Sequence, residues 1–581
     1  MYRRHKLSLM LLIAALLVGL LSACSQNDNG GNNQPGQNAG GDNGASENAG
    51  NAGANNAAAD EEKAAAIRAG EYKFEEPVTI TTVKATDNTI EFKNGETVEN
   101  NVHTQWARDE LGIDIEYLWQ VPGDQFATKI RLMLTSGEQL PDILETEDMT
   151  LLNEMIESGY YRDITEDFEM YASDWYQEVM GSDPLMWSQM MYDGKKMGLP
   201  GFANAGNDNA VMWIRQDLLD ELDMEAPTTF EELEALMQAM KDEQPGSVDN
   251  LIPLGLSLGA GGGSNPNPFA GWLGESTWVF GPSGTIPAQW LLDEETDTLV
   301  HGSTKPEMKA GLERIKSWYD KGFISKEAGL HDENKLAELT GQGRIGILVA
   351  PYWLMNWPVP DLQKNVPGAT MNPFPVPTLD GVAAARDTKF LRGGMLVRKD
   401  FEHADALFLY LNRLVSGRDA GGEFENGFAE DYDYTVLDDG TISTEEDAIP
   451  GGKVSIMKYF LYNPTAPFDL MQMMDKIASG AEPETAAEVR MTRTNPNQLR
   501  AGQIVNEGWE QGVYIPTQFT GANTPALQSK GGILAKLEGE TFTSMIYGKK
   551  PISDFDSFVE EWKKIGGQQV TDEVNAWYAK K

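Results

Sequence analysis

The sequence predicts an α/β fold, because β-rich segments alternate with helical segments from about residue 76 onward. Residues 78–83 are rich in β-branched side chains, and residues 113–117 alternate apolar and polar side chains, so both are expected to form strands. A helix over 126–134 and a short strand over 142–144 are expected to follow. This alternation predicts a mainly parallel sheet wrapped by helices, and 581 residues are enough for two or three domains.

Two later helices can be placed by their ends. Thr229 and Glu232 have the spacing of a capping box ahead of an apolar helical stripe. Near the C-terminus, Ser553 is expected to cap a helix that ends at Gly566 and Gly567. The apolar stripes of both helices are interpreted as core faces.

The first 23 residues have the order of a secretory signal peptide. A basic start at Arg3, Arg4 and Lys6 precedes an apolar run over 7–21, which is too short to span a membrane comfortably and lacks a stop-transfer flank. The run ends in Leu-Ser-Ala-Cys, which resembles the lipobox of bacterial lipoproteins. The resemblance implies that Cys24 is diacylated and becomes the mature N-terminus. Two acyl chains give stable anchoring, so the protein is expected on the extracellular face of the cytoplasmic membrane.

The segment after Cys24 is expected to be a flexible tether over 24–70. Asn, Gly, Gln and Ala dominate residues 25 to about 60, with no large apolar side chain to start a core. A short helix is expected near its end, over 60–73.

Charge and cysteine content exclude several kinds of function. The net charge of −43 disfavours binding to nucleic acid and to anionic headgroups. Cys24 is the only cysteine, so its lipidation leaves none for disulfides, metal sites or nucleophilic catalysis. The five histidines are scattered without metal-ligand spacing, so neither a metal site nor a cofactor is expected.

Five motifs follow one another in the folded part of the chain. They are Leu-Thr-Ser-Gly-Glu-Gln-Leu-Pro-Asp-Ile at 134–143, Asp-Gly-Lys-Lys-Met-Gly-Leu-Pro at 193–200, Trp-Ile-Arg-Gln-Asp-Leu-Leu at 213–219 with Pro-Thr-Thr-Phe at 227–230, Gly-Arg-Ile-Gly-Ile at 343–347 with Pro-Tyr-Trp at 351–353, and Gly-Lys-Lys-Pro-Ile-Ser-Asp-Phe-Asp at 548–556 with Thr-Asp-Glu-Val-Asn at 571–575. In this order, they resemble the extracellular solute-binding proteins of ABC importers. The resemblance is to the carbohydrate-type family that includes maltose-binding protein, in its large Gram-positive lipoprotein branch.

The resemblance implies two α/β lobes with a hinge and a central cleft, like periplasmic binding proteins. Each lobe is discontinuous, with 75–212 and about 390–460 in lobe 1, and 213–389 and about 461–581 in lobe 2. The implied function is non-catalytic: an oligosaccharide binds in the cleft and is delivered to the transmembrane permease subunits of an ABC importer. The protein is expected to be a monomer.

Two loops differ from known ligand loops. Some relatives carry an Asn/Asp/Gly-rich calcium loop where this chain has residues 241–250, and most of its alternate oxygen ligands are missing here. No structural calcium is therefore expected. The Gly-rich stretch 259–266 lacks the lysine of a phosphate-binding loop and is interpreted as a cleft-rim or interlobe loop.

A sugar site needs aromatic planes for ring faces and polar side chains for hydroxyls. The chain has 14 tryptophans, of which Trp272, Trp278 and Trp353 are the candidates. Trp353 is the strongest, because the resemblance places the aromatic residue of its motif at the cleft. Core packing is the alternative for each of them.

The loops after strands supply candidate polar groups, because such loops line the cleft of a doubly wound sheet. These candidates are Asp124, Glu147, Asp148, Asn204 and Asp208, each of which could also be a solvated loop residue. Arg392, at the expected lobe crossing, could reach the cleft and would suit an anionic sugar, or it could pair with an acidic neighbour.

Two other functions stay open at this point. A secreted glycosidase would need two carboxylates at a fixed separation across a cleft, and 89 acidic residues do not exclude such a pair. A surface lipoprotein without a transport function would leave the cleft motifs unexplained.

Overall fold

Helices and strands alternate along the folded chain in the computed structural model, so the predicted α/β class is confirmed. The structure describes residues 59–86, 92–248, 250–259, 268–419, 421–521 and 523–580. The expected signal peptide, Cys24 and most of the expected tether and Gly-rich loop lie outside these ranges. Within them, no helix has the length and apolar character that crossing a bilayer requires.

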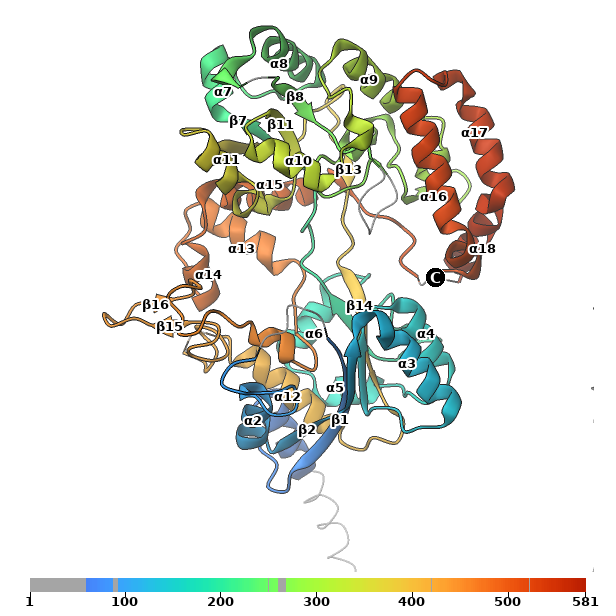
Figure 1. Cartoon of the computed structure of the whole chain (residues 1–581). Coiled ribbons are helices and arrows are strands. Elements are labelled where there is room, and N and C mark those ends of the chain that lie inside the picture. The colour runs from blue at the N-terminus through green and yellow to red at the C-terminus, as the bar shows by residue number, and fades with distance from the viewer. Residues whose placement is uncertain are drawn as a thin grey trace, which may run out of the picture. The chain divides into compact units, whose positions relative to one another are not determined.

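The buried side chains form one cluster in lobe 2 and two clusters in lobe 1, which divides residues 59–580 into two lobes. Figure 1 shows the two lobes. Lobe 1 is built around buried residues from 67–205 and 390–462, and lobe 2 around buried residues from 210–385 and 471–574. Both lobes are therefore discontinuous in sequence. The chain passes between them at 203–210, 387–390 and 463–468.

Lobe 1 contains strands with helices on both faces. β1 (Val78–Thr86) pairs in parallel with β2 (Ile113–Pro122), and β14 (Leu391–Val397) lies between β3 (Ile143–Thr146) and β6 (Leu199–Phe202). Its helices are α2 (Val102–Trp106), α3 (Gly123–Ser136), α4 (Met149–Glu157), α5 (Thr165–Tyr171), α6 (Asp174–Gly181) and α12 (Ala404–Ser416), with a π-helical turn at Ala107–Leu111 and short hairpins β4–β5 (Met191–Tyr192, Lys195–Lys196) and β15–β16 (Thr435–Val436, Ile442–Ser443).

The two faces of this sheet follow from the alternation of side chains along a strand. On β14, Met395 and Val397 pack into the core that includes α12, whereas Leu396 packs into the core formed with α3 and α4. On β3, Ile143 and Leu144 divide in the same way. Figure 1 accordingly shows α3 and α4 on one side of β14 and α12 on the other.

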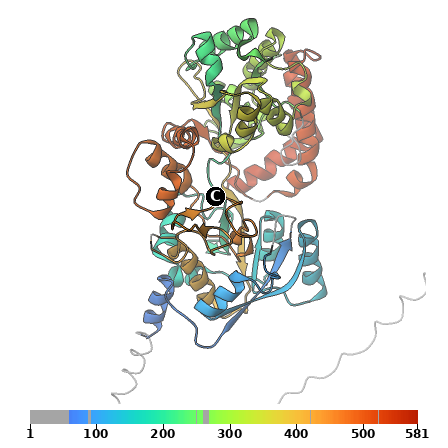
Figure 2. The same ribbon diagram turned by 60° about the vertical axis from the view of Figure 1, so that its left-hand side comes forward.

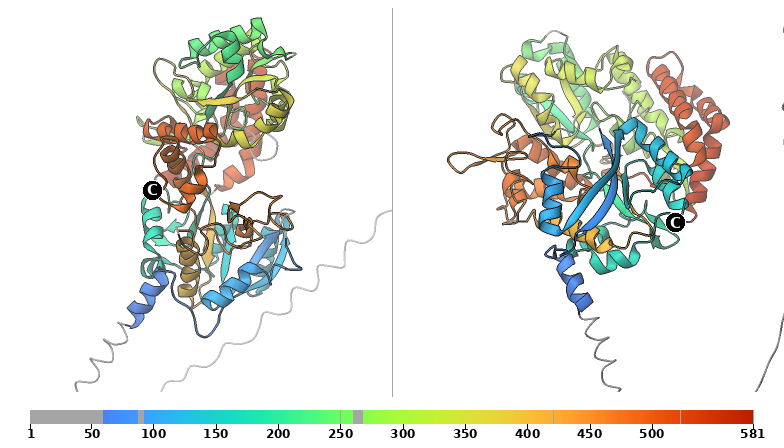
Figure 3. Two further views of the ribbon diagram at one scale, coloured as in Figure 1. Left: turned by 90° about the vertical axis from the view of Figure 1, so that its left-hand side faces the viewer. Right: turned by 60° about the horizontal axis from the view of Figure 1, so that its bottom comes forward.

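Lobe 2 is built on a four-stranded sheet. The strand order is β12 (Met371–Phe374), β7 (Val211–Arg215), β11 (Ile345–Ala350) and β8 (Ile252–Gly255). Every residue of β7 and β11 is buried, as expected for central strands covered on both faces. The other elements are α7 (Gln216–Leu222), α8 (Phe230–Glu243), α9 (Met308–Lys321), α10 (Glu333–Gly341), α11 (Val359–Asn365), α13 (Asp469–Ala478), α14 (Ala486–Met491), α15 (Pro496–Glu510), α16 (Pro525–Ile546), α17 (Phe555–Trp562), α18 (Gln568–Tyr578), and the pairs β9–β10 (Trp290–Asp293, Thr298–His301) and β13–β17 (Ala385–Arg386, Tyr514–Ile515). The turned views show α16, α17 and α18 together along one side of this lobe (Figure 2, Figure 3).

The prediction of a mainly parallel sheet is wrong. β7 runs antiparallel to both β11 and β12, and β14 runs antiparallel to both β3 and β6. The crossings explain this, because β7 and β14 are the strands that enter a lobe directly from the other lobe. β7 and β14 each start at a crossing and run away from it. The strands that pair with them run in the opposite direction and end near the crossings. The carboxyl ends of those neighbours therefore lie at the junction of the lobes.

The end of the expected tether is folded onto lobe 1. Residues 59–68 are helical, Ala64 and Ile67 are buried, and Lys63 forms an ion pair with Asp405 at 2.7 Å. The described part of 24–70 is therefore not a free linker. Its apolar residues were too few to indicate a core by themselves, and they are buried because α12 covers them.

The predicted cap of α8 is confirmed, and the predicted cap near the C-terminus is wrong. The Thr229 side chain accepts from the Glu232 N–H, and the Glu232 side chain reaches back to the Thr229 N–H. At the other site, α17 begins at Phe555, after a 3₁₀ turn that contains Ser553, and has no side-chain cap. The chain kinks at Gly566 and then continues as α18.

Replacing Ile67 with alanine tests the folded end of the tether. Because Ile67 is fully buried, Ile67→Ala is expected to lower the free energy of unfolding by about 2–5 kcal/mol. Glu62→Ala, on an exposed position of the same helix, should change it by less than about 0.5 kcal/mol. Urea denaturation gives both values, and equal small effects would show that the helix is not packed in solution.

Candidate functional site

Three tryptophans form a half-exposed aromatic cluster beside the carboxyl end of β11. The ring centroids of Trp272 and Trp353 lie 5.3 Å apart, and those of Trp272 and Trp357 lie 5.7 Å apart. The buried Trp213 on β7 fixes this segment, because its indole N–H donates to the carbonyl oxygen of Pro351. Trp357 was not among the predicted site residues, although its position four residues after Trp353 was the available signal.

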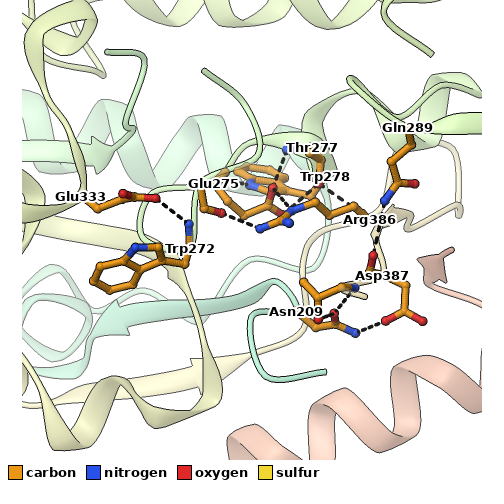
Figure 4. A network of polar contacts seen from close by, with 11 residues as sticks. Asn209, Trp272, Glu275, Thr277, Trp278, Gln289, Glu333, Arg386 and Asp387 are labelled. Carbon is orange, nitrogen blue, oxygen red and sulfur yellow. Dashed lines mark hydrogen bonds and ion pairs between the residues drawn. The ribbon is translucent and has the colours of Figure 1, made fainter. Parts of the chain in front are cut away.

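Arg386, at the end of β13, lies next to this cluster. Its guanidinium donates to the carbonyl oxygen of Gly271, one residue before Trp272, and lies 3.8 Å from the carboxylate of Glu275 (Figure 4). Glu275 also accepts from the backbone and hydroxyl of Thr277. Arg386 therefore joins the segment that carries Trp272 to the crossing at 387–390.

Two further carboxyl groups face this region. Glu333, at the start of α10, accepts from the backbone N–H of Trp272 at 3.0 Å (Figure 4). Asp208, in the first crossing, accepts from the side-chain amide of Asn207. Burial raises the pKa of both carboxyl groups, and Arg386 partly offsets the shift. The lobe-2 wall is defined here as Asp208, Trp272, Glu333, Trp353, Trp357 and Arg386.

Trp278 is not a site residue, which corrects the prediction from sequence. Its side chain is fully buried and packs against Phe230 and Trp318 in the core of lobe 2. Its indole N–H donates to the carbonyl oxygen of Glu275. The backbone turn at residues 277–279 directs the ring inward, so it has no surface for a ligand.

Lobe 1 contains a cavity of about 320 Å³ at the ends of β1 and β3. Its lining residues are Thr82, Val83, Lys84, Ala85, Tyr117, Gly123, Phe126, Glu145, Thr146, Glu147, Asp148, Phe460 and Leu461, and they define the lobe-1 wall. Glu147 and Asp148, predicted from the loop after β3, both line this cavity. Arg392 lies beside them, and its guanidinium pairs with Glu147 at 2.8 Å.

Glu145 is the member of this wall that the prediction missed. Its carboxyl group is accessible to water inside the cavity, but the surrounding protein desolvates it and raises its pKa to about 7. Lys84 opposes this shift. A carboxyl group with this pKa can accept or donate a hydrogen bond near neutral pH, which suits a ligand hydroxyl.

The remaining predicted residues have structural partners or lie beside the cavity. Asp148 caps α4 by accepting from the N–H groups of Thr150 and Leu151, so one of its oxygens is engaged. Asp124 lies exposed in the first turn of α3, where its charge complements the helix dipole, and it does not line the cavity. Asn204 lies half-buried in the first crossing.

A buried amide ties two of the crossings together. The Asn209 side chain donates to the Asp387 carboxylate at 2.8 Å and accepts from the backbone and hydroxyl of Thr388 (Figure 4). Trp509 on α15 donates to the same carboxylate oxygen of Asp387 at 3.2 Å. The crossings at 203–210 and 387–390 are therefore held side by side.

The chemistry of the two walls favours binding of a polyhydroxylated ligand. Aromatic faces, carboxyl groups and guanidinium groups are all present. In the described part of the chain, no group of three or more His, Cys, Asp or Glu side chains could hold a metal ion.

The comparisons with known proteins agree with this arrangement. The family model described as "Bacterial extracellular solute-binding protein" matches residues 89–411. The chain is 21% identical over 492 residues to lipoprotein LipO of Bacillus subtilis, a match that covers 80% of this chain and 86% of that protein. It is 23% identical over 318 residues to the fructooligosaccharide ABC transporter substrate-binding protein FusA of Streptococcus pneumoniae, covering 50% of this chain and 53% of FusA.

Solved structures show the same two-lobed fold. The chain superposes on a solute-binding protein of Bifidobacterium longum infantis, described as binding HMO, with a TM-score of 0.59 at 16% identity. The FusA complex with kestose and the alginate-binding protein AlgQ2 give TM-scores of 0.53 and 0.55, each at 15% identity. Each match covers 87% of this chain and 99% of the other.

The raised pKa of Glu145 predicts a pH dependence of stability. Between the ordinary glutamate pKa and about 7, the folded protein retains a proton that the unfolded chain has released, so this group's contribution falls as the pH rises through that window. Glu145→Gln removes the titration. The melting temperature of the wild type is therefore expected to fall relative to that of Glu145→Gln between pH 5 and pH 8.

Glu62→Gln is the control, because Glu62 is exposed and is not among the charged groups that act on Glu145. Its melting temperature should keep the pH dependence of the wild type. Parallel curves for Glu145→Gln and the wild type would contradict the desolvation of Glu145.

Proposed function

Because the chain belongs to the bacterial extracellular solute-binding protein family, we propose that it binds an oligosaccharide between its two lobes and delivers it to an ABC importer. The observation that carries the proposal is the placement of two complementary walls at the ends of strands from both sheets. One wall supplies the tryptophan cluster for ring faces, and the other supplies carboxyl groups for hydroxyls. FusA, a fructooligosaccharide-binding protein of an ABC transporter, and the HMO-binding protein support this ligand class by analogy.

The walls favour a neutral oligosaccharide over an acidic one. Each bears more carboxyl groups than basic groups, and burial raises the pKa of Glu145, Asp208 and Glu333. A ligand carboxylate would disfavour the charged form of these groups further. Arg392 and Arg386 are already engaged by Glu147 and Glu275. We therefore propose hydroxyl recognition by Glu145, Glu147, Asp148, Asn204, Asp208 and Arg392, with Asp124 at the rim.

Closure about the crossings would bring the walls together around the ligand. The lobe-1 cavity is lined by lobe 1 alone, so approach of the lobes would add contacts from the lobe-2 wall to a sugar bound there. Binding energy would then favour the closed arrangement, and the permease subunits could distinguish it from the open one.

The alternatives are weaker. The family is a class of binding proteins and not of enzymes, which removes the glycosidase alternative. A lipoprotein without a transport function would not need two matched walls. We also propose anchoring through a diacylated Cys24 on the extracellular face of the membrane, supported by the lipobox-like sequence and the similarity to LipO. A tether raises the effective concentration of a receptor near its permease.

Isothermal titration against neutral plant and microbial oligosaccharides tests the ligand class. At least one is expected to bind, and Trp353→Ala should weaken it roughly tenfold or more, because one stacking face is lost. Trp278→Phe, a change in the core, should leave the affinity unchanged. Binding only to uronate oligosaccharides, or to no sugar, would contradict the proposal.

Replacing the expected lipid acceptor tests the anchor. The wild-type chain expressed in a Gram-positive host should fractionate with membranes, and Cys24→Ala should lose the lipid mass and the membrane association. Mass spectrometry of the mature N-terminus gives the modification directly. Equal membrane association of both chains would contradict lipid anchoring.

A further inference from the structure

A second cavity lies at the crossings and is separate from both walls. Its volume is about 430 Å³, and it shares no lining residue with the lobe-1 cavity. Asp183 and Gln189 of lobe 1, the crossing at 387–390, and the end of α15 with the following segment to Thr520 all contribute to its lining. We call this cavity the hinge pocket. Its size is within the range of small-molecule sites.

The hinge pocket has aromatic sides. Phe390 and Phe468 contact edge to face at 5.1 Å, and Phe468 and Trp509 do so at 5.4 Å. Tyr514 also lines the pocket. Trp509 packs against the cores of both lobes, so this aromatic surface spans their junction. Such a surface fits the face of a small ring.

Lys389 supplies a cation without a partner. Its ammonium forms no hydrogen bond or ion pair with any described residue, although its side chain lines the pocket. Water can reach it, yet the surrounding protein lowers its pKa by desolvation, and no neighbouring carboxylate offsets the shift. An anion bound beside the ammonium would offset the free-energy cost of desolvating its charge.

The carboxylates of the pocket have other roles. Asp183 accepts from the backbone N–H of Leu185 at 2.7 Å, and Asp387 accepts from Asn209 and Trp509. Glu510 lies exposed at the end of α15. None of them pairs with Lys389, so the ammonium stays available to a ligand.

Two buried polar atoms of the pocket also lack partners among the described residues. They are the side-chain carbonyl oxygen of Gln189 and the hydroxyl of Thr520. These residues belong to different lobes and are joined by one long hydrogen bond, from the Gln189 amide to the Thr520 carbonyl oxygen at 3.4 Å. A ligand hydroxyl could donate to Gln189 and accept from Thr520.

From this geometry, we propose that the hinge pocket is a second binding site, for a small hydroxylated ring carboxylate. The carboxylate pairs with Lys389, the ring packs against Phe390, Phe468 and Trp509, and a hydroxyl completes the bonds of Gln189 and Thr520. The site is distinct from the oligosaccharide site, because no residue of either wall lines it.

Occupancy of the hinge pocket is coupled to the lobes. Its sides come from both lobes, so rotation about the crossings changes its shape. A ligand that fits the present arrangement stabilises it against closure. If the proposed oligosaccharide binds by closure, the two ligands weaken each other by the same factor.

Titration with four probes tests the site directly. Glucuronate represents sugar carboxylates and 4-hydroxybenzoate represents aromatic ones, with glucose and 4-hydroxybenzyl alcohol as their neutral counterparts. At least one carboxylate is expected to bind the wild type in the millimolar range or tighter, and its neutral counterpart should bind at least tenfold more weakly. Saturation-transfer NMR and calorimetry measure these affinities.

Variants assign the binding to the pocket. Lys389→Gln should weaken the carboxylate about tenfold or more, Lys389→Arg should retain it, and the exposed Lys536→Gln should leave it unchanged. Trp353→Ala, on the lobe-2 wall, should also leave it unchanged. Failure of both carboxylates to bind, or equal binding to wild type and Lys389→Gln, would overturn the proposal. Loss of oligosaccharide binding alone would overturn only the function proposed above.

Discussion

One buried amide determines how the two lobes are joined. Asn209 is fully buried, and its side chain binds both Asp387 and Thr388, so two segments that cross between the lobes run side by side. Each polar group of this contact that lost its hydrogen-bond partner would cost about 1–3 kcal/mol. The cost favours the side-by-side arrangement of the two crossings. The indole N–H of Trp509 donates to the Asp387 carboxylate, so α15 is a third segment that binds at this contact. β7 begins just after Asn209 and β14 just after Thr388, so both strands start from this contact.

The direction of the strands follows from these crossings and creates the site. β7 and β14 start at the junction and run away from it, so their neighbours end there with side chains available for a ligand. The tryptophan cluster follows β11, and Glu145 lies at the end of β3. A polar, half-buried region at the junction is compatible with stability because each lobe has its own large core. Recognition and movement thus use the same part of the chain.

Two features that depend only on residues close together in the sequence were predicted correctly. The strand at 78–83 and the capping box of Thr229 depend on neighbouring residues, and both are confirmed. Trp278 and Trp353 cannot be distinguished in this way, because burial of Trp278 depends on Phe230 and Trp318 from distant helices. Glu145 was missed for a similar reason, since Lys84 and Phe460 complete its cavity. The antiparallel strands depend on the crossings, which no local periodicity reveals.

Closure of the lobes around a sugar is the central claim, and an interlobe distance measures it most directly. With Cys24→Ser in place, spin labels at Leu132→Cys on lobe 1 and Leu330→Cys on lobe 2 occupy exposed positions of the two lobes. Pulsed electron paramagnetic resonance with a saturating neutral oligosaccharide should then show a shift of the distance distribution. Adding Trp353→Ala should raise the sugar concentration that gives half of the shift roughly tenfold or more. An unchanged distribution in the presence of bound sugar would contradict the account.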